Sequence, residues 1–331
     1  MSDKRLLKGF LFASISMLLV SLQPIIALAR DSSIDAYLFA SITCFYQSIF
    51  FLPVMILQRR KLKTQIRNPR LGSSGDIEFI SLLDGWKNKK TFSVILYLGI
   101  NFAITQVLFY YAFDLAGAIN GSLSQKTTVI FALAFGYVIN REKITIKQVA
   151  FSILLLFGVL LATTQGEFKL LEINLGVFLM IIVAMLWMLA HSITKPILDR
   201  NEIISSQIVF SRNLVNAIIL ISSYLLLFPL DNLLVLLNPT NQFFFILMSL
   251  NYSIDLFCWY LSLKYLDVSK ATIIIAPTPI VTAIISTLLF GEIFSIFHLF
   301  GMIIIIISIV IIMWEREEKK EKIKRKRIKV V

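Results

Sequence analysis

Ten apolar segments, each long enough to cross a bilayer as a helix, constrain this chain more than any other feature. A transmembrane helix needs about 20 mostly apolar residues, and each segment holds between 17 and 26. They lie at residues 9–29, 37–57, 91–113, 118–139, 148–164, 174–194, 203–228, 242–263, 271–290 and 295–313. Such runs are too long for barrel strands, and only a helix satisfies all its backbone hydrogen bonds within one segment. The sequence therefore predicts an all-α integral membrane protein with ten transmembrane helices.

The composition excludes a water-soluble domain. Hydrophobic residues make up 57% of the chain and charged residues 16%, against about 25% charged residues in ordinary globular proteins. The longest connection, residues 58–90, is too short to build a core of its own. The chain has no Walker A, H-E-x-x-H, G-x-S-x-G or C-x-x-C motif, so we expect no catalytic residue, metal site or cofactor.

The basic residues predict how the spans are oriented. Lysine and arginine near helix ends are retained on the cytoplasmic side, and 28 of the 32 fall in connections that alternate to one side. This places both termini in the cytoplasm of a cell-membrane protein. Ala27-Leu28-Ala29 resembles a signal-peptide cleavage site, but the apolar run before it is about twice the usual length, and cleavage would spoil the alternation.

The same distribution explains the net charge of +12 without a nucleic-acid partner. Eighteen basic residues lie in the 58–90 loop and in the tail after Trp314. Their first role is orientation, and their second is attraction to anionic lipids, worth about 1 kcal/mol per residue near the surface.

A constant offset of 150 residues reveals an internal repeat. It superimposes polar residues without a gap, and a second offset of 168 residues aligns the first span with the sixth. The polar pairs at the first offset are Asn101 with Asn251, Tyr110 with Tyr260, Thr128 with Thr278 and Glu142 with Glu292. The unit therefore holds five spans, and since five is odd the second copy must cross the membrane in the opposite sense. We expect a 5+5 inverted-topology repeat, with halves at 1–166 and 167–314 and a basic tail at 315–331.

Short motifs in both halves carry a family resemblance. The second half has the segment 260–272, then Ala276-Pro277-Thr278-Pro279-Ile280-Val281 and Phe290-Gly291-Glu292; the first half has weaker copies at 110–113, 120–123 and 140–142. On these residues the chain resembles an EamA-type member of the drug/metabolite transporter superfamily over all ten spans. It departs at Thr127, which stands opposite Pro277, and in the long 58–90 loop. The resemblance implies a central cavity and alternating access, but no particular substrate.

Three charged residues lie at membrane depth, where each costs about 2.5–3.5 kcal/mol and marks a functional site by default. They are Lys126, Arg212 and Asp255. Asp255 shares one helical face with Asn251 and Trp259, and the 150-residue offset places Asn101, Thr105 and Phe109 on the equivalent face of the third span. We expect these two faces to line the substrate cavity; an aspartate salt-bridged for assembly alone is the alternative.

Lys126 follows Gln125 in an unusually polar part of its span. It could bind a carboxylate or phosphate of the substrate, or it could only neutralise Asp255; both satisfy the rule for charges in membranes. For Arg212 we expect a structural role, as a peripheral arginine bonded to carbonyls at a helix end.

A histidine and two prolines complete the set of expected site residues. His191 lies one turn after Trp187, and the 168-residue offset places Gln23 opposite His191. A neutral imidazole there could contact substrate or relay a proton, or it could serve packing alone. Pro277 and Pro279 should break the ninth span and form a hinge, with a static kink as the alternative.

Further residues have roles at helix ends. We expect His298 to be interfacial, and Glu142 and Glu292, with Thr145 and Ser295, to form the turns and N-caps that begin the fifth and tenth spans.

These patterns favour a secondary transporter that moves a small polar or amphipathic metabolite, such as an amino acid, by alternating access. A membrane-embedded enzyme or a lipid-handling scaffold without solute flux is the alternative, although neither would explain an inverted repeat.

Overall fold

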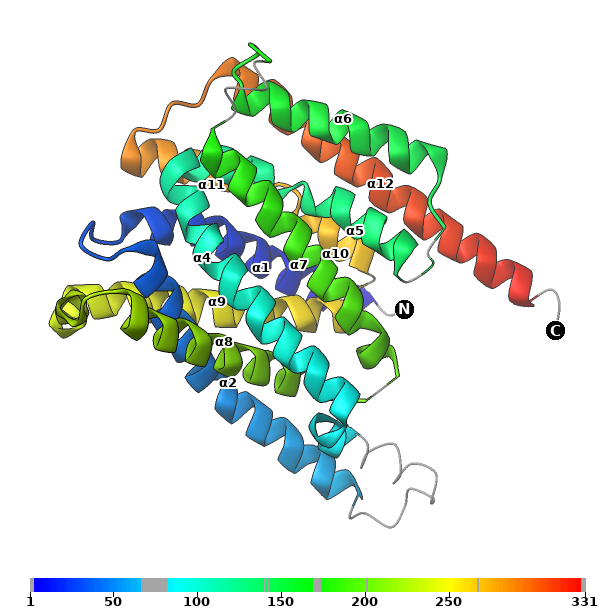
Figure 1. The fold of residues 1–331 in the computed structure, drawn as a ribbon. Helices are drawn as coiled ribbons and strands as arrows, with labels where there is room; N and C mark the ends of the chain where they lie inside the picture. Colours follow the sequence, from blue (N-terminus) through cyan, green and yellow to red (C-terminus); the bar gives the residue numbers. More distant parts are fainter. Residues whose placement is uncertain are drawn as a thin grey trace. The chain divides into compact units, whose positions relative to one another are not determined.

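The computed structural model describes residues 3–66, 82–139, 141, 143–168, 174–200, 202–266 and 268–328, and these are helices joined by short turns and connections. No strand occurs in these ranges (Figure 1). The helices are α1 (Asp3–Ala29), α2 (Ala36–Ile66), η1 (Gly85–Lys87), α4 (Lys89–Gln125), α5 (Thr128–Val138), α6 (Ile146–Thr163), α7 (Leu175–Asp199), α8 (Ser205–Leu227), η3 (Leu230–Leu237), α9 (Pro239–Tyr265), α10 (Val268–Ile275), α11 (Thr278–Phe290) and α12 (Ile296–Ile328). Nine helical segments of the described chain are long and apolar enough to cross a membrane.

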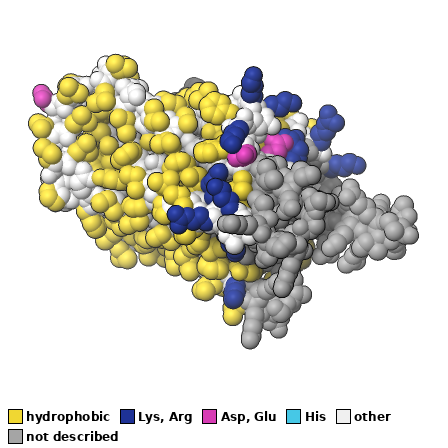
Figure 2. All heavy atoms as spheres, turned by 90° about the horizontal axis from the view of Figure 1, so that it is seen from below, with side chains coloured by type: hydrophobic (Ala, Val, Ile, Leu, Met, Phe, Trp, Pro, Cys, Tyr) yellow, Lys and Arg dark blue, Asp and Glu magenta, His cyan; other side chains and the backbone are white. Residues whose placement is uncertain are grey.

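Three of the helices, α2, α4 and α12, extend well beyond the predicted spans. α2 continues to Ile66, and α4 begins at Lys89, so the ends of the expected 58–90 loop are helical. α12 likewise continues to Ile328, so the basic tail begins as a helix. Hydrophobic side chains cover most of the described surface that faces the viewer in Figure 2, and lysine and arginine side chains gather on one part of it. An apolar surface of this kind suits a lipid environment.

The chain packs as two compact units, each assembled from both repeats. Unit 1 comprises residues 1–29, 112–185 and 254–331, and unit 2 comprises residues 30–111 and 186–253. Each unit therefore combines helices of both repeats that are distant in the sequence.

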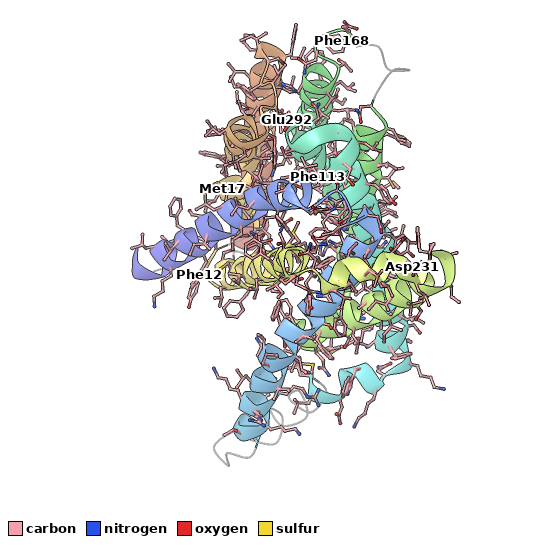
Figure 3. The ribbon with its side chains drawn as sticks, turned by 90° about the vertical axis from the view of Figure 1, so that its left-hand side faces the viewer. Phe12, Met17, Phe113, Phe168, Asp231 and Glu292 are labelled. Carbon is pink, nitrogen blue, oxygen red and sulfur yellow. The ribbon has the colours of Figure 1, made fainter. Side chains whose placement is uncertain are left out.

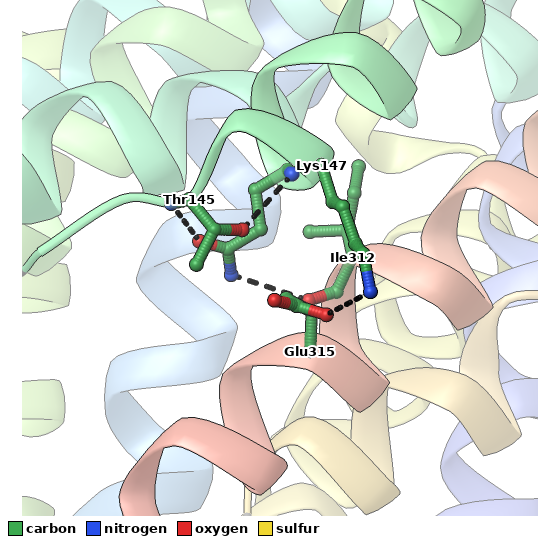
Figure 4. A network of polar contacts seen from close by, with 5 residues as sticks. Thr145, Lys147, Ile312 and Glu315 are labelled. Carbon is green, nitrogen blue, oxygen red and sulfur yellow. Dashed lines mark hydrogen bonds and ion pairs between the residues drawn. The ribbon is translucent and has the colours of Figure 1, made fainter.

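The pair α6 and α12 is the most closely packed part of unit 1 (Figure 1). A Cβ atom added to Gly301 would lie 2.5 Å from the Gly158 carbonyl oxygen, so both glycines are needed for this approach, as is common between membrane helices. At one end, Gln148 Nε2 donates to the Ile312 carbonyl at 3.3 Å, and Lys147 forms an ion pair with Glu315 at 3.6 Å (Figure 4).

Unit 2 is organised by α2 and α8. Its core is aromatic: the Phe39 ring on α2 lies 4.8 Å from the ring of Tyr110 on α4 and 5.5 Å from that of Phe245 on α9. The rings of Tyr37 on α2 and Tyr224 on α8 also lie 5.9 Å apart, tilted by 45°. Because packing rather than hydrophobicity drives helix association in lipid, such close ring contacts are what holds this unit together.

The 150-residue repeat is visible in the helix boundaries. α5 begins at Thr128 and α11 at Thr278, while α6 begins at Ile146 and α12 at Ile296; both pairs are 150 residues apart. The residues before the second pair, Thr145 and Ser295, both act as N-caps: Thr145 forms a capping box with Gln148, and Ser295 and His298 exchange equivalent bonds. The predicted N-caps are thus confirmed, and the two-repeat fold with them.

The third and fourth spans meet at a kink in α4, within the connection 114–117 that the predicted spans 91–113 and 118–139 leave between them. The 37 residues of α4 comprise two helical segments, separated at Gly117, which has a non-helical φ of 76° and ψ of 173°. This conformation belongs to a region that only glycine readily adopts.

Glu292, labelled in Figure 3, lies in the turn before α12, as expected, and its side chain also reaches the backbone beside the kink of α4. Its carboxylate accepts the Ile119 N–H at 3.3 Å and also accepts the Ser286 hydroxyl. A break frees N–H groups that need new acceptors, and the carboxylate supplies one. Glu142, its repeat partner, is outside the described residues.

Candidate functional site

Two helices of unit 1 are interrupted at equivalent positions. The turn Lys126–Thr127 separates α4 from α5, and the turn Ala276–Pro277 separates α10 from α11, 150 residues later. Pro277 explains the second break because it lacks an N–H. The predicted break of the ninth span is therefore confirmed, while Pro279 lies in the first turn of α11, where proline is tolerated.

The first break has no proline and depends on hydroxyl groups instead. Thr127 donates both its N–H, at 3.1 Å, and its side-chain hydroxyl, at 2.7 Å, to the Ser124 carbonyl. These bonds to the third residue back replace the α-helical bond to the fourth. The apolar pattern predicts one uninterrupted span over 118–139, and the structure corrects this prediction at Lys126–Thr127.

Lys126 lies at the first break and is buried, with 8% of its surface exposed. Its ammonium group donates to the carbonyl of Ile275, the last residue of α10, at 3.5 Å. A cation at a helix C-terminus is favourable because the carbonyls there carry partial negative charge. Lys126 thus connects the two breaks, and the neighbouring Gln125 is half-buried.

Asp255 on α9 is held by neutral donors from α1. Its carboxylate accepts the Ser16 hydroxyl at 2.5 Å and Gln23 Nε2 at 3.2 Å, and all three side chains are buried. Both Lys126 and Asp255 are described, and they form no ion pair with each other. The alternative in which Lys126 only neutralises Asp255 is therefore wrong.

Among these three side chains, the sequence pattern predicted Gln23 and Asp255 as site residues but not Ser16. Ser16 precedes Gln23 by seven residues, which places both on one face of α1. This spacing could have indicated Ser16, but a single serine in an apolar helix does not by itself indicate a site.

In unit 2, Thr105 occupies the position that corresponds to Asp255. Trp187 Nε1 on α7 donates to the Thr105 hydroxyl at 3.1 Å, and the Trp187 ring lies 5.3 Å from that of Phe109. α7 is the repeat partner of α1, and α4 is that of α9. The α4–α7 bond at position 105 in unit 2 therefore corresponds to the α9–α1 bonds at position 255 in unit 1. Only the second repeat places a charge there.

The two predicted asparagines are buried and incompletely bonded. Asn101 Nδ2 donates to the Tyr97 hydroxyl at 3.4 Å. Asn101 Oδ1 and Asn251 Oδ1 are buried without a hydrogen-bond partner, although buried polar atoms are nearly always paired. Trp259 is half-buried. Unpaired amide oxygens are suited to accept from a bound molecule.

His191 and Arg212 meet the same ring in unit 2. The Phe102 ring lies 6.1 Å from the His191 ring, and the Arg212 guanidinium carbon lies 4.0 Å from its centroid. Arg212 is 5% exposed and its Nε has no partner, so the expectation of a peripheral arginine bonded to carbonyls is wrong. A cation over a desolvated aromatic face gains about 2 kcal/mol.

His298 lies in the first turn of α12 and is buried, with 4% of its surface exposed. Its Nε2 lies 3.1 Å from Asn120 Oδ1 and 3.0 Å from Gln165 Nε2. This links α12 to α4 and to the end of α6 within unit 1. Among the described residues, no group of three histidine, cysteine or acidic side chains could hold a metal ion.

Comparisons with known proteins agree with this architecture. Residues 7–164 and 174–314 each match the model of the EamA-like transporter family. A solved structure titled only "Crystal structure of protein" superposes with a TM-score of 0.60 at 14% identity, over 94% of this chain and 96% of the other. No curated protein matches the chain significantly. The two family matches follow the two repeats, so the chain belongs to the EamA-like transporter family, as an α-helical multi-pass membrane protein with ten transmembrane segments in two five-helix repeats.

Proposed function

We propose that this protein is a secondary transporter that moves a small polar or amphipathic metabolite, such as an amino acid, across the cytoplasmic membrane by alternating access. Both termini lie in the cytoplasm in this proposal. The family supplies the general activity, membrane transport. The two buried charged residues of unit 1, Lys126 and Asp255, support the proposal that the solute is polar and carries charged groups.

The observation that carries the proposal is the pair of equivalent positions 105 and 255. The side chain at each position forms a hydrogen bond to a second helix, α7 for Thr105 and α1 for Asp255, and these two helix pairs are equivalent in the repeat. Thr105 does so with an uncharged hydroxyl, so the helix contact itself needs no carboxylate. A buried carboxylate in a membrane helix is costly, and Asp255 therefore has a role beyond packing, which we assign to binding a cationic group of the solute.

Lys126 supports the same reasoning from the opposite charge. Its repeat partner is Ala276, which forms the same kind of break without a charge. We assign Lys126 to an anionic group of the solute. Together with Asp255 it would recognise a molecule that carries both charges, as an amino acid does.

The remaining expected residues would complete the binding site. Asn101 and Asn251 offer unpaired carbonyl oxygens. The other members are Gln23, Thr105, Gln125, Trp187 and Trp259, and His191 could relay a proton if transport is coupled to protons.

Transport by the purified full-length protein in liposomes tests this function. A panel of radiolabelled amino acids is tested for saturable uptake and for counterflow, which a scaffold or an enzyme would not show. For the compound that is transported, we expect Asp255→Asn and Asp255→Thr to lower uptake at low substrate concentration at least tenfold, equivalent to about 1.4 kcal/mol of binding. Asp255→Thr is the sharper variant because it installs the residue of position 105.

Asp231→Asn serves as the matched control because Asp231 is an exposed carboxylate at the start of η3. It should leave uptake unchanged. Variants are compared only where their thermal midpoints agree with that of the parent protein. Full uptake by both Asp255 variants would remove Asp255 from the site, and saturable uptake without counterflow would argue against alternating access.

A further inference from the structure

A basic cavity lies in unit 2, apart from the residues assigned to transport. It has a volume of about 360 Å³ and is lined by Arg59, Lys63, Leu83, Asp84, Trp86 and Lys87. The first two residues belong to the end of α2 and the others to η1 and the residues before it. The cavity thus joins both ends of the connection that precedes α4.

The cavity is built by specific contacts. Arg59 Nη1 donates to the Leu83 carbonyl at 2.8 Å, and its guanidinium carbon lies 4.9 Å from the Trp86 ring. Gly85 approaches the α7–α8 connection so closely that an added Cβ would lie 1.6 Å from the Glu202 carbonyl oxygen. These contacts fix the position of η1 against the end of α2, so the basic side chains converge on a defined site.

The lining favours a phosphate-bearing ligand. Three cationic side chains face one carboxylate, that of Asp84, which is paired with Lys87 at 3.1 Å. Arginine offers a planar set of donors that matches phosphate oxygens. Lysine adds a mobile point charge, and the excess of cations selects an anion.

The surroundings favour a lipid over a soluble anion. Ile56 and Leu57, less than one turn before Arg59 on α2, are 38% and 63% exposed. Trp86 is 38% exposed, and tryptophan is enriched where hydrocarbon meets headgroups. An acyl chain could therefore lie along the apolar end of α2 while its phosphate occupies the basic cavity.

We propose that this cavity binds the headgroup of an anionic phospholipid. Arg59 and Lys63 bind the phosphodiester, and Trp86 packs against the glycerol region. The site acts as a lipid anchor for the connection before α4, separate from solute transport.

Binding of radiolabelled dioctanoyl phosphatidylglycerol to the full-length protein in neutral detergent tests the proposal. The variant Arg59→Gln/Lys63→Gln should bind at least about tenfold more weakly, because two charge-assisted contacts are lost. Arg60→Gln/Lys61→Gln removes the same charge from the same helix outside the cavity and should weaken binding less than about twofold. Lys63→Gln alone, at an exposed side chain, should act in the same direction even if Arg59 is needed for folding.

Three outcomes would overturn the proposal. Equal weakening by the two double variants would show diffuse attraction rather than a site. Equally good competition by dioctanoyl phosphatidylcholine would show that the anionic headgroup is not recognised. Displacement by inorganic phosphate as efficient as by unlabelled phosphatidylglycerol would identify a site for a free anion.

Discussion

Single residues distinguish the two repeats where the backbone does not. Position 255 carries a carboxylate and position 105 a hydroxyl, although each bonds to the equivalent helix of its own unit. Position 126 carries an ammonium group and position 276 a methyl group, although both belong to helix breaks. The equivalent positions in the first and second repeats keep the same backbone features without these two charges. We therefore infer that Asp255 and Lys126 serve function rather than folding.

Replacing Lys126 tests this interpretation. Lys126→Met removes the charge but keeps most of the side chain, and we expect the KM for the transported compound to rise at least about tenfold. The thermal midpoint should stay the same or rise, because a desolvated charge is replaced by an apolar group. Lys126→Arg should recover part of the affinity.

The control is Lys147→Met, since Lys147 is a lysine whose side chain is 70% exposed. Uptake kinetics of all three variants give the answer. An unchanged KM in Lys126→Met would assign Lys126 to the helix break alone.

For single residues, the sequence predicted which buried polar side chains stand out better than it predicted which groups they contact. Asp255, Lys126 and Gln23 stand out because charge and amide groups are rare in membrane helices. Their hydrogen-bond partners depend on how neighbouring helices are rotated and shifted relative to one another. The pattern of apolar residues carries little information about this. The bond of Lys126 to a backbone carbonyl and the contact of Arg212 with Phe102 therefore could not be predicted.

Among the helices, α4 has backbone features that its pattern of hydrophobic residues does not predict. The segments on both sides of Gly117 are apolar, so the sequence predicts two spans that meet near this residue but not the backbone conformation of the kink. The break at Lys126–Thr127 is missed because no proline marks it, although the run Ser122-Leu-Ser-Gln-Lys-Thr-Thr128 is polar enough to indicate an interruption. Proline in the second repeat made the equivalent break predictable.

Gly117→Ala should destabilise the protein without touching the transport residues. The φ of 76° and ψ of 173° at this position suit glycine only, and such a conformation costs another residue about 1–3 kcal/mol. The new Cβ would also lie 2.1 Å from Glu292 Oε1. A lower thermal midpoint in detergent is the expected result.

Leu115→Ala is the matched control for this change. Leu115 is two residues away and 47% exposed, so its truncation should have little effect. Equal midpoints for Gly117→Ala and the parent would mean that the kink is not maintained in solution.

For the whole molecule, the sequence predicts the architecture well. Ten spans, a five-span unit and its inversion all follow from segment lengths, a constant offset and an odd number, and the family match covers both repeats. The division into two interleaved units could not be predicted, because it depends on which helices pack together. The orientation in the membrane stays a prediction from the basic residues.

Cysteine labelling tests the predicted orientation. The native thiols, Cys44 and Cys258, are 1% and 6% exposed, so the background from an impermeant maleimide should be low. Asp231→Cys should react in intact cells because the connection that holds it is predicted to be external. Asn88→Cys, on the predicted cytoplasmic side, should react only after the cells are permeabilised.

Both positions are exposed in the structure, so each serves as the accessibility control for the other. The reverse pattern would invert the topology, and labelling of both in intact cells would exclude a single orientation.

The two helix breaks differ in reversibility. Pro277 has no N–H to return to its helix, so the gap between α10 and α11 is permanent. Thr127 keeps its N–H and bonds to the Ser124 carbonyl, three residues back. The Leu123 carbonyl, which would be the α-helical acceptor for Thr127, accepts the Lys126 N–H at 3.1 Å. A shift of this run of bonds by one residue would join α4 and α5 into one continuous helix. The two breaks occupy equivalent positions in the repeat, but only the break at Lys126–Thr127 can be closed by backbone hydrogen bonds. The two repeats therefore have equivalent helix boundaries and unequal flexibility at their breaks.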